Sequence, residues 1–253
     1  MPAFGTALAG AATAIAAWQI IVFAFAPPAF ILPGPIAVLQ TLVERWHFLL
    51  PHIGLTVVET ILGLIIGSAF GASTAFTAAA LPRIGRLVWP LILVAQALPV
   101  FAIAPLLVLW FGFGLASKIV MTSLIIFFPV ASAFADGLRR TDAAILDACA
   151  LTEASHWQTL RLIRLPLALP SLVTGLRIAA PLAPLGAVVG EWVGASGGLG
   201  FLMIQANARM QTAEVFAALA ILAAMTLLLR ALVDQLARCL PPWARERSSR
   251  NHD

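Results

Sequence analysis

Long apolar runs separated by short polar segments dominate this chain of 253 residues. An apolar run of about 20 residues is long enough to cross a lipid bilayer as a helix. The pattern predicts six such helices, over residues 6–26, 53–80, 87–111, 116–138, 171–193 and 214–236. It also predicts a semi-polar interfacial helix over 36–50, where Trp46 and His47 suit a membrane surface. We therefore expect an all-α integral membrane protein with about six transmembrane helices.

Glycines and prolines modify several of these predicted helices. Gly63, Gly67 and Gly71 recur at four-residue spacing, which predicts a smooth strip where another helix can approach closely. The third predicted helix contains three prolines, and the fifth contains two. Each proline frees a backbone carbonyl, which must then face protein or a cavity rather than lipid. We interpret the proline-rich third helix either as pathway lining or as a packed kink.

A polar, basic island over 147–166 interrupts the apolar pattern. It predicts two short helices meeting at a bend. Ser155 and Gln158 have the spacing of a capping box, which predicts that the second helix begins there. Leu165 followed by Pro166 predicts the end of that helix, because a residue before proline avoids the helical region.

The composition agrees with a membrane protein, since 61% of residues are hydrophobic and only 10% are charged. The net charge of +4 is no sign of nucleic-acid binding, because the arginines stand at span ends and in loops. Cys149 and Cys239 fall in segments predicted to be cytoplasmic, so we expect no disulfide. No cysteine and histidine spacing predicts a metal site.

The arginines also predict the topology. With the N-terminus inside, most of them lie on the cytoplasmic side. These are Arg83, Arg86, Arg139, Arg140, Arg161, Arg164, Arg238, Arg245, Arg247 and Arg250. Only Arg45, Lys118 and Arg209 then lie outside. The same orientation places the polar island and both termini in the cytoplasm, with 237–253 as a cytoplasmic tail.

No catalytic constellation is visible, so we expect a non-catalytic protein without a cofactor of its own. The glycine-rich stretch 194–200 is not a phosphate loop, because no Gly-Lys-Ser/Thr follows it. We interpret it as a tight, re-entrant loop.

Several polar residues within the apolar segments are candidates for a solute pathway. A carboxylate at the bilayer centre costs about 3 kcal/mol, so one found there faces a partner, a cavity or the interface. Glu191 is the strongest candidate, while Glu59 suits a structural hydrogen bond better. The remaining candidates are Gln96, Pro99, Trp192 and Asn207.

The polar island resembles the cytoplasmic loop of ABC-transporter inner-membrane permeases. That signature reads Glu-Ala-Ala, then glycine, then Ile-x-Leu-Pro. Asp147, Ala148 and Cys149 match its beginning, and Ile163, Leu165 and Pro166 match its end. Glu153, followed by Ala154 and Ser155, stands where the family has glycine. This departure predicts either a bend without positive φ or an extended first helix.

The resemblance extends along most of the chain. The stretches 96–105, 109–112, 190–194 and 207–212 look like permeases of the nitrate, sulfonate, taurine and pyrimidine branch. The region 190–212 is most similar to permeases named for hydroxymethylpyrimidine, a thiamine precursor (ThiX type). The resemblance implies a type I importer permease with the MetI-like fold. Its solute would be this precursor or, alternatively, an aliphatic sulfonate, taurine or nitrate.

The resemblance also implies an assembly in the bacterial inner membrane. The loop would dock on an ATPase subunit that carries ATP-Mg, with two copies facing two permease chains as a homodimer. A separate extracytoplasmic binding protein would choose the solute. We expect one transmembrane domain over 1–253, with 1–52 as the first helix and an interfacial segment, and 53–236 as a core that contains the coupling loop 139–170. An ion-coupled secondary transporter and a membrane enzyme are the alternatives, but we see neither an internal repeat nor a catalytic set.

Overall fold

The computed structural model describes residues 2–97 and 99–238, which form helices joined by short connections. The tail 239–253, with Cys239 and three of the predicted cytoplasmic arginines, lies outside the described residues. The helices are α1 (Pro2–Phe25), α2 (Pro35–Glu44), α3 (Trp46–Ala80), α4 (Pro82–Ala97), α5 (Val100–Phe111), α6 (Leu115–Arg139), α7 (Ala143–Leu151), α8 (His156–Thr159), the π-helical turn η1 (Leu160–Arg164), α9 (Leu165–Gly194), α10 (Leu199–Ala208) and α11 (Thr212–Arg238).

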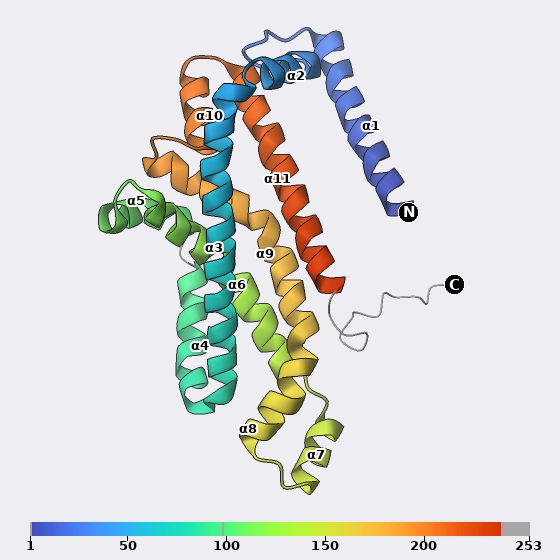
Figure 1. The fold of residues 1–253 in the computed structure, drawn as a ribbon, viewed down its shortest axis with the longest axis vertical. Helices are drawn as coiled ribbons and strands as arrows, with labels where there is room; N and C mark the ends of the chain where they lie inside the picture. Colours follow the sequence, from blue (N-terminus) through green and yellow to red (C-terminus); the bar gives the residue numbers. More distant parts are fainter. Residues whose placement is uncertain (1, 98, 239–253) are drawn as a thin grey trace.

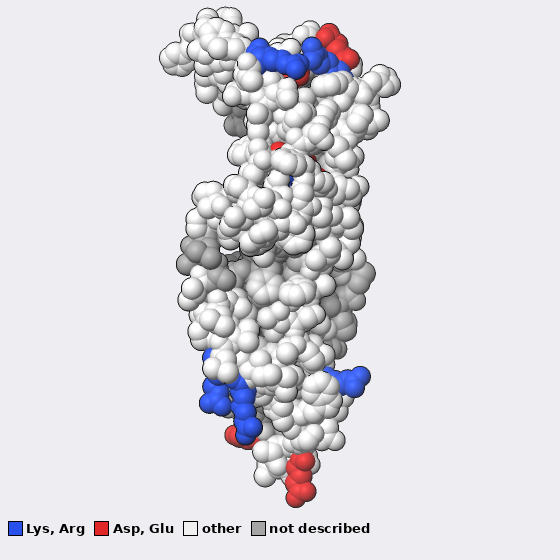
Figure 2. Space-filling model, turned by 90° about the vertical axis from the view of Figure 1, so that its left-hand side faces the viewer, with Lys and Arg blue, Asp and Glu red and all other residues white. Residues whose placement is uncertain are grey.

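Four helical segments are long and apolar enough to cross a membrane: Trp46–Ala80, Leu115–Arg139, His156–Gly194 and Thr212–Arg238. They correspond to four of the six predicted spans. Charged side chains gather near the two ends of the face drawn in Figure 2, and a broad uncharged band separates them. The band has the character expected of a surface in contact with lipid. The prediction of an all-α membrane protein is confirmed.

The core is built on α6, which packs extensively against both α3 and α9. The glycine strip of α3 lies on this contact, as predicted. A methyl group added to Gly67 would come within 2.7 Å of the Ser123 carbonyl oxygen, and one added to Gly71 within 2.7 Å of the Phe127 carbonyl oxygen. Glycine therefore lets the backbones of α3 and α6 approach closely.

The predicted interfacial helix over 36–50 is wrong in its second half. α2 ends at Glu44, and α3 begins at Trp46 after a bend at Arg45. The Arg45 carbonyl accepts the N–H groups of Phe48 and Leu49, so it starts the long helix. Trp46 and His47 consequently belong to the first turn of α3. Figure 1 shows α2 crossing the upper end of the molecule, with α1 standing apart from the bundle.

The prediction of a single helix over 87–111 is also wrong. α4 ends at Ala97, and Pro99 is the N-cap of α5 with extended backbone angles of φ −66° and ψ 108°. Proline cannot donate the helical hydrogen bond, and it keeps its predecessor out of the helical region. Pro90 and Pro105 lie inside α4 and α5 without ending either helix.

Candidate functional site

The polar island forms a helical hairpin at the lower end of the molecule (Figure 1). α7 begins where the Asp142 carboxylate accepts the Ala144 N–H at 2.9 Å. Its end has the hydrogen bonds of a Schellman motif: Ala154 N–H donates to the Cys149 carbonyl, and Glu153 N–H donates to the Ala150 carbonyl, both at 3.1 Å.

Glu153 adopts the left-handed conformation of this motif, with φ of 54°. This is the position at which the resembling family has glycine, which takes that conformation without steric cost. Both predictions made for Glu153 are wrong, because it neither avoids positive φ nor extends α7. The chain therefore bends here without glycine, and the left-handed backbone of Glu153 carries a steric cost that glycine would not have.

The predicted capping box opens α8 and is confirmed. Gln158 N–H donates to Ser155 Oγ at 3.2 Å, and Ser155 N–H donates to Gln158 Oε1 at 2.8 Å. The predicted stop at Pro166 is wrong. The chain passes through the π-turn η1 into α9, and Pro166 occupies the first turn of α9, where a missing N–H is tolerated. The segment His156–Gly194 is one continuous helical rod, and Pro181 and Pro184 do not break it.

α8 is attached to the lower end of α3. His156 Nε2 lies 3.2 Å from the Ala79 carbonyl oxygen. The Trp157 ring meets the Phe76 ring edge-on, with centroids 5.9 Å apart. The loop is therefore linked to the bundle through side chains as well as through the chain itself.

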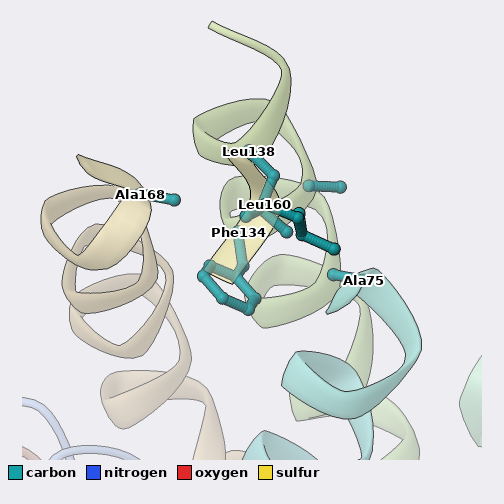
Figure 3. Close-up of a cluster of buried hydrophobic side chains, with 6 residues drawn as sticks. Ala75, Phe134, Leu138, Leu160 and Ala168 are labelled. Atoms are coloured by element: carbon teal, nitrogen blue, oxygen red, sulfur yellow. The ribbon is translucent and has the colours of Figure 1, made fainter. Parts of the chain in front are cut away.

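Leu160 fixes the beginning of the rod. Its side chain is fully buried among Ala75, Phe134, Leu138 and Ala168, which come from α3, α6 and α9 (Figure 3). Arg164 adds a second attachment, since its Nε and Nη2 donate to the Leu138 carbonyl at 2.9 and 2.7 Å. α8 and η1 are thus fastened to the core.

α7, in contrast, has no buried residue. Ala144, Asp147, Ala148 and Leu151 share one helical face, and all four are exposed. We call this set the outer face of α7. Leu151 is 88% exposed, which is unusual for a leucine outside lipid and suits a surface that meets another protein. Cys149, on the opposite side, is half-buried.

A second group of polar side chains lies near the other end of α9. We define the outer cluster as His52, Thr56, Glu59, Lys118 and Glu191. Glu191 is 1% exposed and caps the beginning of α10: its carboxylate accepts the Gly200 N–H and the Thr56 hydroxyl, the latter at 2.6 Å.

α3 supplies the remaining caps of α10. Thr56 Oγ1 accepts the Leu199 N–H at 2.8 Å, and His52 Nδ1 accepts the Gly198 N–H at 3.1 Å. These bonds satisfy N–H groups that a helix start leaves without partners. Gly198 has φ of 105°, so the glycine-rich stretch is a tight turn pressed against Glu191.

Lys118 brings α6 into the outer cluster. Its side chain is 1% exposed, and its ammonium group donates to the carbonyl groups of Phe113, Gly114 and Gly194. Glu59 and Glu191 lie close enough for its positive charge to act on them. The predicted topology counts Lys118 among the outer charges, and the structure adds that its ammonium group is buried against three backbone carbonyls.

The structure brings together only two of the pathway candidates, Glu59 and Glu191. Gln96 lines a separate hollow of about 390 Å³ between α4, α5 and α6, and Pro99 starts α5. Trp192 and Asn207 are exposed. Across residues 2–97 and 99–238, no three His, Cys, Asp or Glu side chains converge as metal ligands would.

Sequence reasoning missed three members of the outer cluster. Lys118 carries a usable signal, since it is the only lysine in the chain. Thr56 and His52 precede Glu59 by about one and two helical turns, so a polar stripe on α3 was visible.

Comparison with known proteins now identifies the family. Residues 63–246 match the family model described as binding-protein-dependent transport system inner membrane component. The chain belongs to this family. It is an ABC importer permease subunit, a multi-pass protein of the inner membrane, and the alternative of an ion-coupled transporter is ruled out.

Two relatives cover nearly the whole permease. A protein of Haemophilus influenzae named "Probable ABC transporter permease protein" is 49% identical over 87% of this chain and 89% of its own length. The formylaminopyrimidine transport permease protein ThiX of Halalkalibacterium halodurans is 34% identical over 90% of this chain and 92% of its own length.

The fold of the permease is also found in a solved structure. An inward-facing methionine ABC transporter, MetNI, superposes with a TM-score of 0.68 at 20% identity. The match covers 78% of this chain and 98% of the other. The predicted MetI-like fold is confirmed.

Proposed function

We propose that this permease passes a small polar solute across the inner membrane, driven by a separate ABC ATPase that contacts the outer face of α7. The hairpin of α7 and α8 is the observation that carries this proposal. One of its helices is fully available to a partner, while the other is fastened to the core. A lever between two proteins needs both properties.

In the proposed mechanism, closure of the ATPase on ATP displaces α7. Asp147, Ala148 and Cys149 form the part of α7 that matches the family signature, and Glu153, Ala154 and Ser155 form the bend. Ile163, Leu165 and Pro166 carry the displacement into α9. The contacts of His156 and Trp157 carry it to α3, so two core helices move together.

We propose that the solute path runs beside the outer cluster. Gln96 and Pro99 would line it from α4 and α5, and Trp192 and Asn207 would face it near the outer end. Glu191 is buried and accepts hydrogen bonds from Thr56 and Gly200, which favours a positioning role over direct solute binding. Glu59 is also buried, but its Oε2 has no hydrogen-bond partner, so Glu59 remains the better candidate for contact with a solute. The outer cluster would hold α3, α6, α9 and α10 as one unit while the path opens.

The proposed assembly contains two permease chains and two ATPase chains. Each permease chain offers one hairpin, and a two-fold axis is the commonest way to present two. ATP-Mg would be bound by the ATPase, and both permease termini would lie in the cytoplasm. Native mass spectrometry of the co-purified complex tests the copy number, and a single permease chain per complex would overturn it.

We propose a pyrimidine of the thiamine-precursor type, such as hydroxymethylpyrimidine, as the solute. The likeness to the formylaminopyrimidine permease supports this class. Aliphatic sulfonate and taurine are second candidates, because permeases named for them in Bacillus subtilis and Escherichia coli are 32% and 31% identical. Titration of the cognate binding protein by calorimetry with a pyrimidine and with taurine decides between them.

The coupling role can be tested in proteoliposomes that contain the permease and its ATPase. Ala148→Asp places a charge on the outer face of α7, where an unpaired buried charge is costly once a partner covers it. We expect solute uptake to fall at least tenfold.

The matched control is Ala150→Asp, which lies about 200° away around the same helix. We expect uptake close to that of the unaltered chain. Equal uptake by the two variants, with normal complex assembly, would reject this docking face.

A further inference from the structure

A hollow of about 430 Å³ lies at the lower end of the bundle, between the hairpin of α3 and α4 on one side and α6 with η1 on the other. Three arginines from three different elements line it: Arg86 of α4, Arg139 of α6 and Arg164 of η1. The rest of its wall is small or apolar, and it contains no carboxylate. Figure 2 views the molecule from the side of α4 and α5, and cationic side chains gather near the lower end of that face.

The positive charge of this hollow is not neutralised within the described part of the chain. None of the three arginines there forms an ion pair with a carboxylate. Two of them are nevertheless held in place. The Arg139 guanidinium lies 4.6 Å above the Trp89 ring, and Arg164 donates to the Leu138 carbonyl. Fixed guanidinium groups around a cavity form a preorganised anion site.

The position of the hollow indicates which anions can reach it. Arg86 is the last charged residue of α4, and the residues that follow it toward the middle of the molecule expose apolar side chains. Leu87, Leu91 and Val94 are 74%, 66% and 67% exposed. α7 and α8 extend beyond the hollow toward the lower end (Figure 1). With the uncharged band in the hydrocarbon, the arginines would lie where the lipid headgroups begin.

We infer that the hollow binds a phosphate-bearing anion, either the headgroup phosphate of an anionic phospholipid or a free phosphate. Guanidinium groups match the geometry of phosphate oxygens, and basic pockets between membrane helices are suited to acidic headgroups. The wall of alanine, proline and tryptophan would accept the less polar part of a lipid.

Such a ligand would connect the hollow to the hairpin. Ala79 lines the hollow, and its carbonyl oxygen is the contact of His156 in α8. An anion shared by Arg86, Arg139 and Arg164 would cross-link α4, α6 and η1 next to that contact. The ligand would brace the base of the lever, so this site belongs to regulation or stability rather than to the solute path.

Native mass spectrometry of the purified full-length permease tests the inference. Phosphatidylglycerol, phosphatidylcholine and inorganic phosphate are the three probes. The double variant Arg86→Gln/Arg139→Gln removes two arginines of the hollow. The matched double variant Arg83→Gln/Arg161→Gln removes the same charge from two exposed arginines outside it.

We expect phosphatidylglycerol to bind more tightly than phosphatidylcholine. Each arginine lost from the hollow should weaken binding about fivefold, or about 25-fold for the pair. The matched variant should change affinity less than twofold. If inorganic phosphate binds and competes with phosphatidylglycerol, the hollow takes a free phosphate as well as a lipid. If only the lipid binds, the bound phosphate group comes from the bilayer.

Equal loss in the two double variants, or equal binding of the two lipids, would overturn the inference. Ala78→Leu gives an independent measurement, because it fills the hollow without changing charge and should also weaken phosphatidylglycerol binding. The site would also be refuted if Ala78→Leu and Arg86→Gln/Arg139→Gln, measured separately, both bound phosphatidylglycerol as tightly as the unaltered chain. The assay needs no ATPase and no transport, so its outcome is separate from that of the proposed coupling role.

Discussion

Single side chains fasten the backbone of this permease at two ranges, within one helical turn and across the bundle. The capping box of Ser155 and Gln158 depends on residues three apart, so its spacing is visible in the chain. Lys118 depends on Gly194, which lies 76 positions away. Lys118 is marked as the only lysine in the chain, but its partner at Gly194 is reached only because α6 packs against α9.

Replacing Glu153 by glycine should stabilise the hairpin. Glycine removes the cost of a left-handed side chain, and after its larger loss of entropy on folding the net gain is about 0.5–1 kcal/mol. Hydrogen exchange of the α7 amides should slow about twofold to fivefold. Ala154→Gly is the control, since Ala154 does not have positive φ, and it should speed exchange. Faster exchange in Glu153→Gly would contradict the Schellman assignment.

Replacing Lys118 by methionine should destabilise the whole permease. Three backbone carbonyls would lose their donor, and the neighbouring acidic groups would lose a nearby positive charge, at a cost of about 3–5 kcal/mol. Thermal unfolding in detergent measures the effect as a lower midpoint. The double variant Lys118→Met/Glu59→Gln should recover part of the loss, because one of the two acidic groups is then neutral. If Lys118→Met unfolded at the same midpoint temperature as the unaltered chain, the ammonium group would not contribute to stability.

At the level of helices, the sequence predicted which helices are present better than it predicted the residues at which they begin and end. The four longest apolar helices follow from the length of the apolar runs, and the glycine strip of α3 follows from its four-residue spacing. The break before Pro99 and the continuity through Pro166 do not, although both involve a proline after a leucine. The difference is positional: Pro166 falls in a first turn supported by the buried Leu160, whereas Pro99 itself caps a new helix.

The glycine strip of α3 gives a comparison within one helix. Gly67→Ala should lower stability by about 1–3 kcal/mol, because its methyl group would press on the Ser123 backbone. Gly54→Ala should be neutral or slightly stabilising, since nothing lies within 4 Å of the added methyl. Unfolding in detergent measures both. The close contact of α3 and α6 would be refuted if the two variants were equally stable.

At the level of the whole molecule, the polar island in the sequence predicted a partner protein. The contacts that link this island to α3 became apparent only in the folded structure. His156 and Trp157 looked like ordinary loop residues in the sequence. Their partners, Ala79 and Phe76, lie at the far end of a helix that begins more than a hundred residues earlier. Two of the five residues of the outer cluster, Glu59 and Glu191, were named in the sequence as pathway candidates, because intramembrane carboxylates are conspicuous in an apolar chain.

Trp157→Ala should loosen the proposed lever without removing the docking face. In proteoliposomes with the ATPase, we expect ATP hydrolysis to continue while solute moved per ATP falls about threefold, consistent with an aromatic pair worth about 0.5–1.5 kcal/mol. Phe76→Ala should have a similar effect, and the double variant should add little. Leu162→Ala, at an exposed position of η1, is the control. Full additivity of Trp157→Ala and Phe76→Ala would mean that the two rings act independently.

The continuous rod from His156 to Gly194 has a consequence for angular phase. These thirty-nine residues form one helix without a break. The helix therefore fixes the direction in which Glu191 points relative to the hairpin at its other end. One residue inserted between 185 and 190 would turn Glu191 by about 100° and disengage it from Thr56 and Gly200. The same insertion in the connection at 140–142 would leave that phase intact. The permease should therefore tolerate changes in the length of its loop far better than changes in the length of α9.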